Sequence, residues 1–290
     1  MIVSQLCVYP LKSGRAIELP QAEVKTRGFV GDRELILVSG SGKFITQRQF
    51  PQLAKILVQV ARQDIILRLE DNSFPSLTLT PTLNGSAIEV EIWRDRLLAI
   101  DQGDEAARWF HQFLGLDSTK VCRLVKQSPE HLRAIALPRT LAIASKYSSQ
   151  EEHSIGFVDN YPVMLTATAS LAELNQRIVE IHSSQQQTIP MNRFRPNIVI
   201  ETTEPFIEDR WSLIQIGEIQ FKVAKPCSRC IMTTIDQQQG EKNQLKEPLN
   251  TLGTFRQLSE KGVMFGVNTI PQNEGIIRTG DRLEVIETRN

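Results

Sequence analysis

The chain has 290 residues, 41% of them hydrophobic and 23% charged, which is the composition of an ordinary soluble globular protein of one or two domains. Its 33 basic and 33 acidic side chains balance, which argues against a general nucleic-acid binder. No apolar run approaches the roughly 18 residues of a transmembrane helix, and the first residues lack the basic start and apolar centre of a signal peptide. We therefore expect a cytoplasmic protein that binds neither membranes nor nucleic acids and keeps its four cysteines reduced.

Residues 1–126 are predicted to form a β-rich N-terminal domain. Apolar and β-branched runs, interrupted by Gly, Pro and Ser, begin it at 2–10, 22–26, 34–46 and 53–61. The run 34–46 has Gly-Ser-Gly at its centre and predicts a hairpin. Residues 104–114 predict a helix, because their apolar side chains recur at helical spacing and Gly115 suits a helix end.

Residues 127–290 are predicted to form a second domain, with 127–154 as the connection. Ser170 and Glu173 have the spacing of a capping box at the start of a helix over 170–180. Strands are expected at 197–201, at 218–225, where apolar and polar residues alternate, and at 278–287. Pro226 is expected to end the second of these strands. The fold class is therefore mainly β with a few helices, built around a barrel-like core.

Cys227 and Cys230 follow Pro226, with Arg229 between them, and are expected on a loop at the strand end. A zinc ribbon needs two such pairs. A thioredoxin-like redox pair normally opens a helix, which the β-branched residues after Cys230 disfavour. Two packed structural thiols fit poorly with a charged residue between them. Spacing alone leaves all three open, but a neighbouring cation favours a thiolate, which prefers soft metals or electrophiles.

The segment CSRCIMTTID, with NRFRPNIVI upstream and YPLKSG near the start, resembles the MOSC proteins (molybdenum-cofactor sulfurase C-terminal domain). More narrowly, the chain is similar over nearly its whole length to the mitochondrial amidoxime-reducing component and its bacterial counterparts. The resemblance implies a MOSC N-terminal β-barrel domain (1–126) and a MOSC domain (127–290) that binds the molybdenum cofactor, molybdopterin. It implies that Cys230 is the protein ligand to molybdenum. Cys227 is expected to be a packed side chain.

A chain of zero net charge must gather cations locally to hold the phosphate and polar ring of such a cofactor. The resemblance implies that these cofactor-binding residues are Lys12, Ser13, Arg33, Arg195 and Asn197, with Arg229 beside the metal ligand. Asp32 is expected to hold the Arg33 guanidinium. In FVDNYP the family's acidic residue is retained as Asp159, but Asn160 and Tyr161 replace two small hydroxyl residues, so Tyr161 is expected to supply a hydroxyl. Thr46 and Arg48 are weaker candidates for the pocket.

The resemblance implies a molybdenum-cofactor-dependent oxidoreductase that reduces N-hydroxylated compounds, namely amidoximes, hydroxylamines and N-hydroxylated bases. Cys230 and Asp159 are its predicted catalytic residues. The sequence has no nucleotide-binding fingerprint. We therefore expect a separate electron-donor protein, ferredoxin-like or cytochrome b5-like with its reductase. Two alternatives are a non-catalytic carrier of molybdenum cofactor or sulfur, and a zinc-stabilised β-scaffold.

Overall fold

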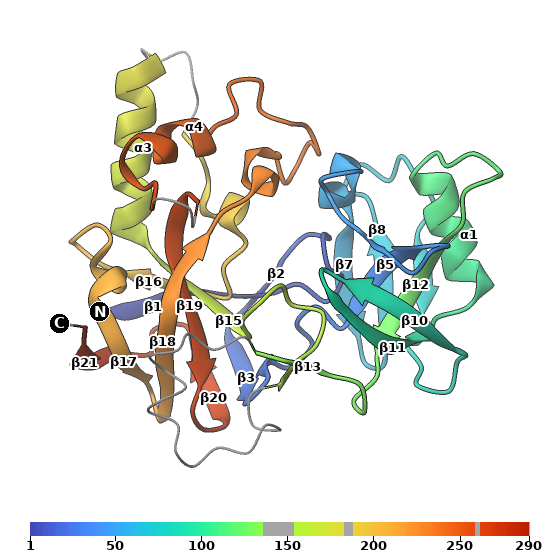
Figure 1. Ribbon diagram of the computed structural model, residues 1–290, viewed down its shortest axis with the longest axis horizontal. Helices are drawn as coiled ribbons and strands as arrows, with labels where there is room; N and C mark the ends of the chain where they lie inside the picture. Colours follow the sequence, from blue (N-terminus) through green and yellow to red (C-terminus); the bar gives the residue numbers. More distant parts are fainter. Residues whose placement is uncertain (136–153, 183–187, 259–261, 290) are drawn as a thin grey trace.

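The computed structural model describes residues 1–135, 154–182, 188–258 and 262–289. Two strand-rich bodies make up the molecule: a larger one on the left of Figure 1, which holds both chain ends, and a smaller one on the right. Strands predominate over helices, so the predicted mainly β fold class is confirmed. Within the described residues, every helix is too short or too polar to cross a lipid bilayer.

A curved eight-stranded sheet forms the larger body. Its strands, in spatial order, are β2 (Ile17–Leu19), β1 (Ile2–Val8), β16 (Ile198–Glu201), β15 (Val163–Ala167), β19 (Met264–Pro271), β18 (Ile219–Ser228), β17 (Trp211–Ile216) and β21 (Leu283–Thr288). The two ends of the sheet approach each other, since Ile2 pairs with Arg282 and the Leu283 amide donates to the Met1 carbonyl at 2.9 Å. The sheet therefore curls into the barrel-like core that the sequence predicts.

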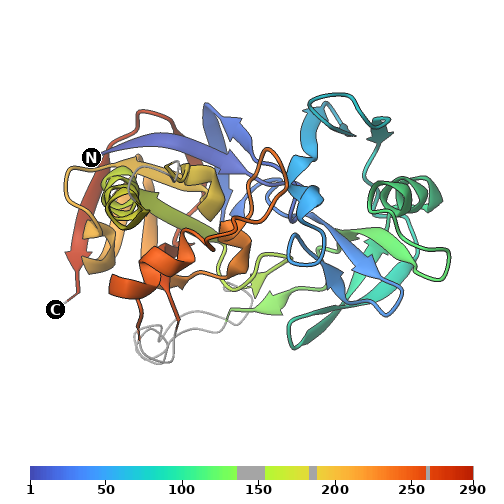
Figure 2. The ribbon, with the colours of Figure 1, turned by 90° about the horizontal axis from the view of Figure 1, so that it is seen from above.

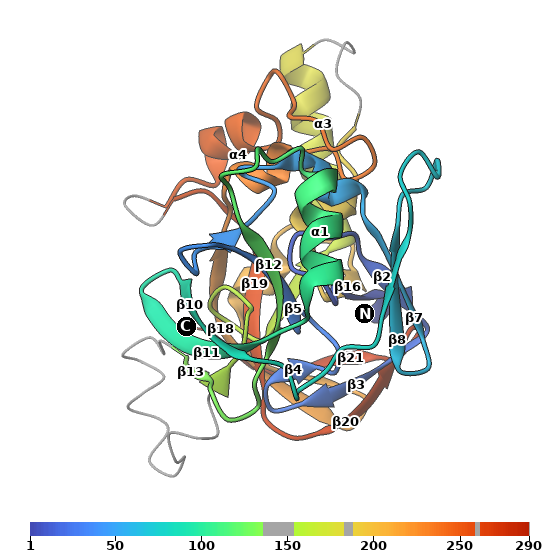
Figure 3. The same cartoon turned by 90° about the vertical axis from the view of Figure 1, so that its right-hand side faces the viewer.

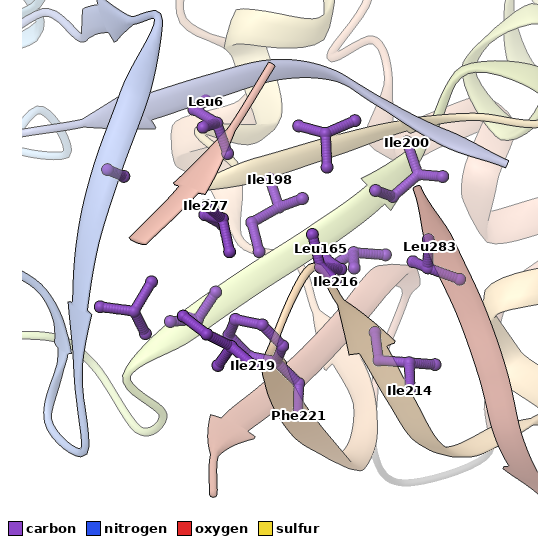
Figure 4. Close-up of a cluster of buried hydrophobic side chains, with 14 of the residues drawn as sticks. Leu6, Leu165, Ile198, Ile200, Ile214, Ile216, Ile219, Phe221, Ile277 and Leu283 are labelled. Carbon is purple, nitrogen blue, oxygen red and sulfur yellow. The ribbon is translucent and has the colours of Figure 1, made fainter. Parts of the chain in front are cut away.

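One hydrophobic core fills this curved sheet (Figure 4). A three-stranded sheet of β20 (Gly275–Arg278), β3 (Gln21–Lys25) and β4 (Gly28–Phe29) packs its apolar residues on the same core. The alternation predicted for β18 is confirmed, because Ile219, Phe221 and Val223 are buried there while the residues between them are partly exposed. Each large apolar side chain removed from water contributes roughly 1.5–3 kcal/mol.

Two sheets and one helix form the smaller body. The first sheet contains β10 (Ala87–Ile92), β11 (Asp95–Asp101), β12 (Cys122–Gln127), β5 (Leu35–Ser39) and β6 (Phe44–Ile45), and the second β7 (Leu57–Ala61), β8 (Asp64–Arg68) and β9 (Leu77–Leu79). Helix α1 (Asp104–Phe113) packs Ala106 and Phe110 against β12 (Figure 3). The predicted helix and the predicted hairpin, which is β5 and β6, are both confirmed.

The first strands of the chain belong to the larger body. Strand β1 pairs with β16, and β3 pairs with β20, so both lie beside strands from the far end of the sequence. In Figure 2 the chain then runs from β1 toward the smaller body. Strands from before and after residue 126 thus pair in the same sheets. The domain boundary at residue 126 stays a prediction. Most of the predicted connection 127–154 lies outside the described residues.

Short helices and turns complete the larger body. The helices are α3 (Thr168–His182) and α4 (Leu249–Phe255), and the 3₁₀ turns are η3 (Met191–Phe194), η4 (Ile207–Arg210) and η5 (Ile231–Thr234). A two-stranded pair, β13 (Arg133–Ala134) with β14 (Ser154–Ile155), also lies in this part of the molecule. The remaining 3₁₀ turn, η1 (Pro51–Lys55), belongs to the smaller body. The predicted capping box is wrong, because α3 begins at Thr168 and Ser170 lies inside it. The Ser170 hydroxyl instead donates to the buried Glu208 carboxyl at 2.8 Å.

The prediction that Pro226 ends its strand is also wrong. Strand β18 continues to Ser228, and Pro226 lies opposite Val267. The register shifts on both sides of Pro226, between Val223 and Lys225 and again before Ser228. Such irregularities let a strand keep its neighbour where proline lacks an N–H to donate.

Candidate functional site

A cavity of about 300 Å³ is lined by residues of both bodies. We call it the cationic cavity because of the side chains described below. It brings together every residue predicted for the cofactor or the metal: Lys12, Ser13, Arg33, Asp159, Tyr161, Arg195, Asn197, Arg229 and Cys230. Of the weaker candidates, Arg48 lines it, whereas the hydroxyl of buried Thr46 is bonded to Gln49 and Thr46 is not part of the lining.

The register of four neighbouring strands explains why residues so distant in sequence meet. The backbone N–H of Asn197 donates to the Met164 carbonyl at 2.9 Å. Met164 pairs with Asn268, and Asn268 pairs with Lys225. All four line the cavity, so one row across the sheet forms part of its wall.

Cys230 is exposed and directly precedes the turn η5, whereas Cys227 is half-buried at the end of β18. Arg229 fixes this segment, because its Nη1 donates to Cys227 Sγ at 3.0 Å and its Nη2 to the Phe194 carbonyl at 2.7 Å. Cys227 also packs on a hydrophobic cluster under the site. Among the described residues no three His, Cys, Asp or Glu side chains gather to hold a metal ion, so the zinc alternative finds no ligand set there.

Positive charge dominates the described lining. Its cations are Lys12, Arg33, Arg48, Arg193, Arg195, Lys225 and Arg229, and its single carboxylate is Asp159. Lys12, Arg193 and Arg195 are each less than a tenth exposed. Burying like charges together is unfavourable unless they are paired or meet an anion.

Lys12 and Asp159 form the ion pair of the cavity. Lys12 Nζ donates to Asp159 Oδ1 at 2.7 Å and to the Phe157 carbonyl at 2.6 Å, and the Trp93 indole N–H donates to the same Oδ1 at 3.2 Å. Desolvation opposes ionisation of Asp159, but the Lys12 ammonium, the Trp93 N–H and the Arg33 charge together outweigh it and hold the pKa of Asp159 below its ordinary value. Burial lowers the pKa of Lys12, and the same ion pair resists that shift.

A second group of contacts surrounds Tyr9. The guanidinium groups of Arg33 and Arg195 lie 4.4 and 4.2 Å from the centroid of its ring. Asp32 holds Arg33 in an ion pair, as predicted, and accepts from Asn197 Nδ2 at 3.0 Å. Burial lowers the pKa of Arg195 to about 10, which leaves it charged at neutral pH. Its Nη1 donates to the Gly14 carbonyl at 2.7 Å, whereas Nε and Nη2 make no hydrogen bond to described residues.

Backbone strain also gathers at the cavity. Ser13, Arg33, Trp93 and Arg195 have φ angles of 73°, 53°, 60° and 53°, in the left-handed region. They are half of the eight non-glycine residues with positive φ in the described part of the chain. Such conformations persist where the surroundings enforce them, and they cluster at ligand sites.

Several lining residues were missed by sequence reasoning, above all Arg193 and Trp93. Arg193 is held by Asp236 at 2.9 Å, yet its buried Nε and Nη1 have no hydrogen-bond partner in the part of the chain that the structure describes. Buried Nε atoms of Arg48 and Arg229 are likewise unpartnered. A signal for Arg193 was its position two residues before Arg195, which the single turn η3 places on the same wall.

Two family models match the chain. Residues 1–117 match the MOSC N-terminal beta barrel domain, and residues 152–284 match the MOSC domain. The chain is 31% identical over 292 residues to mitochondrial amidoxime reducing component 2 of Bos taurus, covering 96% of this chain and 81% of that protein.

The chain belongs to the MOSC family of the amidoxime-reducing components. Mitochondrial amidoxime-reducing component 1 of Homo sapiens is also 31% identical, over 293 residues, covering 96% of this chain and 81% of its own. A third member, the molybdenum cofactor sulfurase of Danio rerio, is 30% identical over 91% of this chain and 31% of its own. The predicted resemblance is confirmed, and these names connect the MOSC family with oxidoreductases and with the molybdenum cofactor.

The donors of this MOSC cavity fit that cofactor. A phosphate is matched by arginine N–H groups and a lysine, a polar ring by amide and hydroxyl groups, and a soft metal by a thiolate. The unpartnered guanidinium nitrogens of Arg193 and Arg229 are donors for which the described residues provide no acceptor.

Proposed function

We propose that this chain is a molybdenum-cofactor-dependent oxidoreductase of the cytoplasm that reduces N-hydroxylated compounds with electrons from a separate donor protein. One observation carries the proposal: an exposed thiol, Cys230, lies in a cavity whose wall contains the buried cations Lys12, Arg193 and Arg195. The names of the relatives, amidoxime-reducing components, support the substrate class.

Each part of the cavity has a separate task in this proposal. The Cys230 thiolate would hold molybdenum, and Arg229 would fix the Cys230 segment through Cys227 and the Phe194 carbonyl. Lys12, Ser13, Arg33, Arg195 and Asn197 would hold the phosphate and the ring, and the N–H groups of Arg193 that have no partner among the described residues would be further donors. When bound, the cofactor would supply the two-electron redox change.

Asp159 has a positioning role in this proposal. Because its pKa is held below the ordinary value, it is a carboxylate at neutral pH and has no proton to give. It orients Lys12 and the Trp93 indole by accepting from both. The protons that leave with the substrate oxygen as water would then come from solvent, to which Asp159 itself is half exposed.

A second function, a carrier of molybdenum cofactor or of sulfur, is favoured by the similarity to the molybdenum cofactor sulfurase. An exposed Cys230 would suit a persulfide as well as a metal. Both functions would use the same cavity, but only the reductase would convert an N-hydroxylated substrate.

The test is to produce the chain in a host that makes the molybdenum cofactor. Molybdenum and released pterin are quantified, and benzamidoxime reduction is followed with reduced methyl viologen as the electron source. Stoichiometric molybdenum and pterin with formation of benzamidine support the reductase. Cofactor without turnover supports the carrier, and stoichiometric zinc without pterin contradicts both.

A further inference from the structure

Trp93 has an unusual place for its residue type. It lies in the two-residue turn between β10 and β11 of the smaller body, where Ile92 pairs with Asp95. Its φ of 60° is one that Asn or Gly adopts readily in such turns and a bulky side chain rarely does. Trp109 and Trp211 are 7% and 1% exposed, whereas Trp93 is 45% exposed and lines the cationic cavity.

Three contacts fix the exposed indole. Its N–H donates to Asp159 of the larger body, the Arg48 guanidinium lies 4.7 Å from the centroid of its ring, and the Phe44 ring meets it edge-on at 5.3 Å. Arg48 also lies 5.8 Å from the centroid of Phe44. A flat aromatic side chain is therefore fixed at the cavity while 45% of it stays exposed. Rigid aromatic side chains of this kind present contact area with little loss of conformational entropy.

We propose that Trp93 determines the substrate preference of the site: it stacks on flat aromatic or heteroaromatic N-hydroxylated compounds and favours them over aliphatic ones. The proposal rests on the proposed function, because it gives that site its substrate class. Trp93 and Cys230 line the same cavity of about 300 Å³, at the lower end of the sizes that hold small ligands. The two side chains therefore border the same ligand space. Aromatic rings favour offset or edge-on contact with each other, and aliphatic groups gain less from the same surface.

A matched pair of substrates tests this, since benzamidoxime and acetamidoxime share the reacting group and differ in the ring. Trp93→Gly removes the indole and suits the positive φ, so the turn itself is spared. Trp93→Phe keeps an aromatic ring of smaller area and loses the N–H to Asp159. KM and kcat are measured for both substrates with the cofactor-loaded protein and reduced methyl viologen, and pterin content is measured in each variant.

For Trp93→Gly we expect KM for benzamidoxime to rise about tenfold, equal to about 1.4 kcal/mol, while KM for acetamidoxime changes less than about twofold. Trp93→Phe should restore most of the preference for the aromatic substrate. Equal changes for the two substrates would reduce Trp93 to a structural contact and overturn the proposal. Loss of pterin from Trp93→Gly would show that the indole stacks on the cofactor instead, and would also overturn it. A wild-type protein that loads pterin but reduces neither amidoxime would refute the proposed function.

Fluorescence gives a second measurement that does not depend on turnover. Because Trp109 and Trp211 are buried, a ligand in the cavity should change the emission of Trp93 in the full-length, cofactor-free chain. We expect saturable quenching by benzamidoxime, none by acetamidoxime, and none in Trp93→Phe. Quenching by benzamidoxime that persists in Trp93→Phe, or that never saturates, would contradict a stacking site at Trp93.

Discussion

The two neighbouring thiols should respond to substitution in opposite ways. The Cys230 thiol is exposed and makes no hydrogen bond to described residues, so Cys230→Ala should change the free energy of unfolding by less than about 0.5 kcal/mol. Cys227 is half-buried, packs on the cluster that includes Phe194 and Leu252, and accepts from Arg229 Nη1 at 3.0 Å. Cys227→Ala removes that packing and one acceptor, so it should cost about 1–2 kcal/mol.

Activity and molybdenum content should show the reverse order, with the larger loss in Cys230→Ala. Cys230→Ala removes the thiolate proposed to hold molybdenum, so benzamidoxime reduction should vanish and the molybdenum content should fall. Pterin should be retained in part, because Lys12, Arg33 and Arg195 would hold it independently of the metal, and its release on denaturation measures this. Cys227→Ala should keep a substantial fraction of both metal and activity.

The assay combines urea unfolding of the cofactor-free variants, compared at their midpoints, with metal analysis and turnover of the loaded proteins. Circular dichroism confirms that each variant is folded. Matched loss of activity in Cys227→Ala and Cys230→Ala, with both folded, would show that the thiols act as a pair. That result would refute the assignment of one metal ligand and one packed side chain.

Three further predictions concern the cofactor, the electron source and pH. Arg195→Glu should lower pterin content more than Arg96→Glu, whose site is an exposed ion pair outside the cavity. A buried charge contact is worth about 2–5 kcal/mol, and equal content in the two variants would contradict the assignment. The wild type should not reduce benzamidoxime with NADH alone, and product formed without a donor protein would refute the need for one. Burial raises the pKa of Glu208 to about 7, so its folded carboxyl keeps a proton that the unfolded chain loses above about pH 4. The urea midpoint should therefore fall as pH rises from about 4 to 7, and Glu208→Gln should flatten this dependence; an unchanged slope would contradict it.

The fold followed from the sequence wherever a short pattern determines the structure. The alternation of Ile219, Phe221 and Val223 and the helical spacing around Phe110 are local, and both predictions are confirmed. The errors occurred where the partner is distant. Ser170 bonds to Glu208, 38 residues away, and Pro226 stays in its strand because of how it pairs with β19. Neither partner can be identified from the residues nearby.

The site divides in the same way. Resemblance predicted Arg195 and Cys230 as site residues, because they lie in motifs that can be read along the chain, and both line the cavity. Trp93 was missed, since its place in the cavity depends on how the smaller body meets the larger one. Its signal was nevertheless present: tryptophan occupies a two-residue turn between two β-runs, where Asn or Gly is the usual choice.

Strain and like charge coincide at the cationic cavity. Arg33 and Arg195 both have left-handed backbone, and both guanidinium groups lie on the ring of Tyr9, although separating them would lower their repulsion. The core around Phe221 shows no such conflict, because its apolar residues satisfy local preference and burial together. A sequence departs from such consistency mainly where function requires it. Asp32 pairs with Arg33, and an anion bound at Arg195 would offset the charge of the second guanidinium, which is the role proposed for the cofactor phosphate.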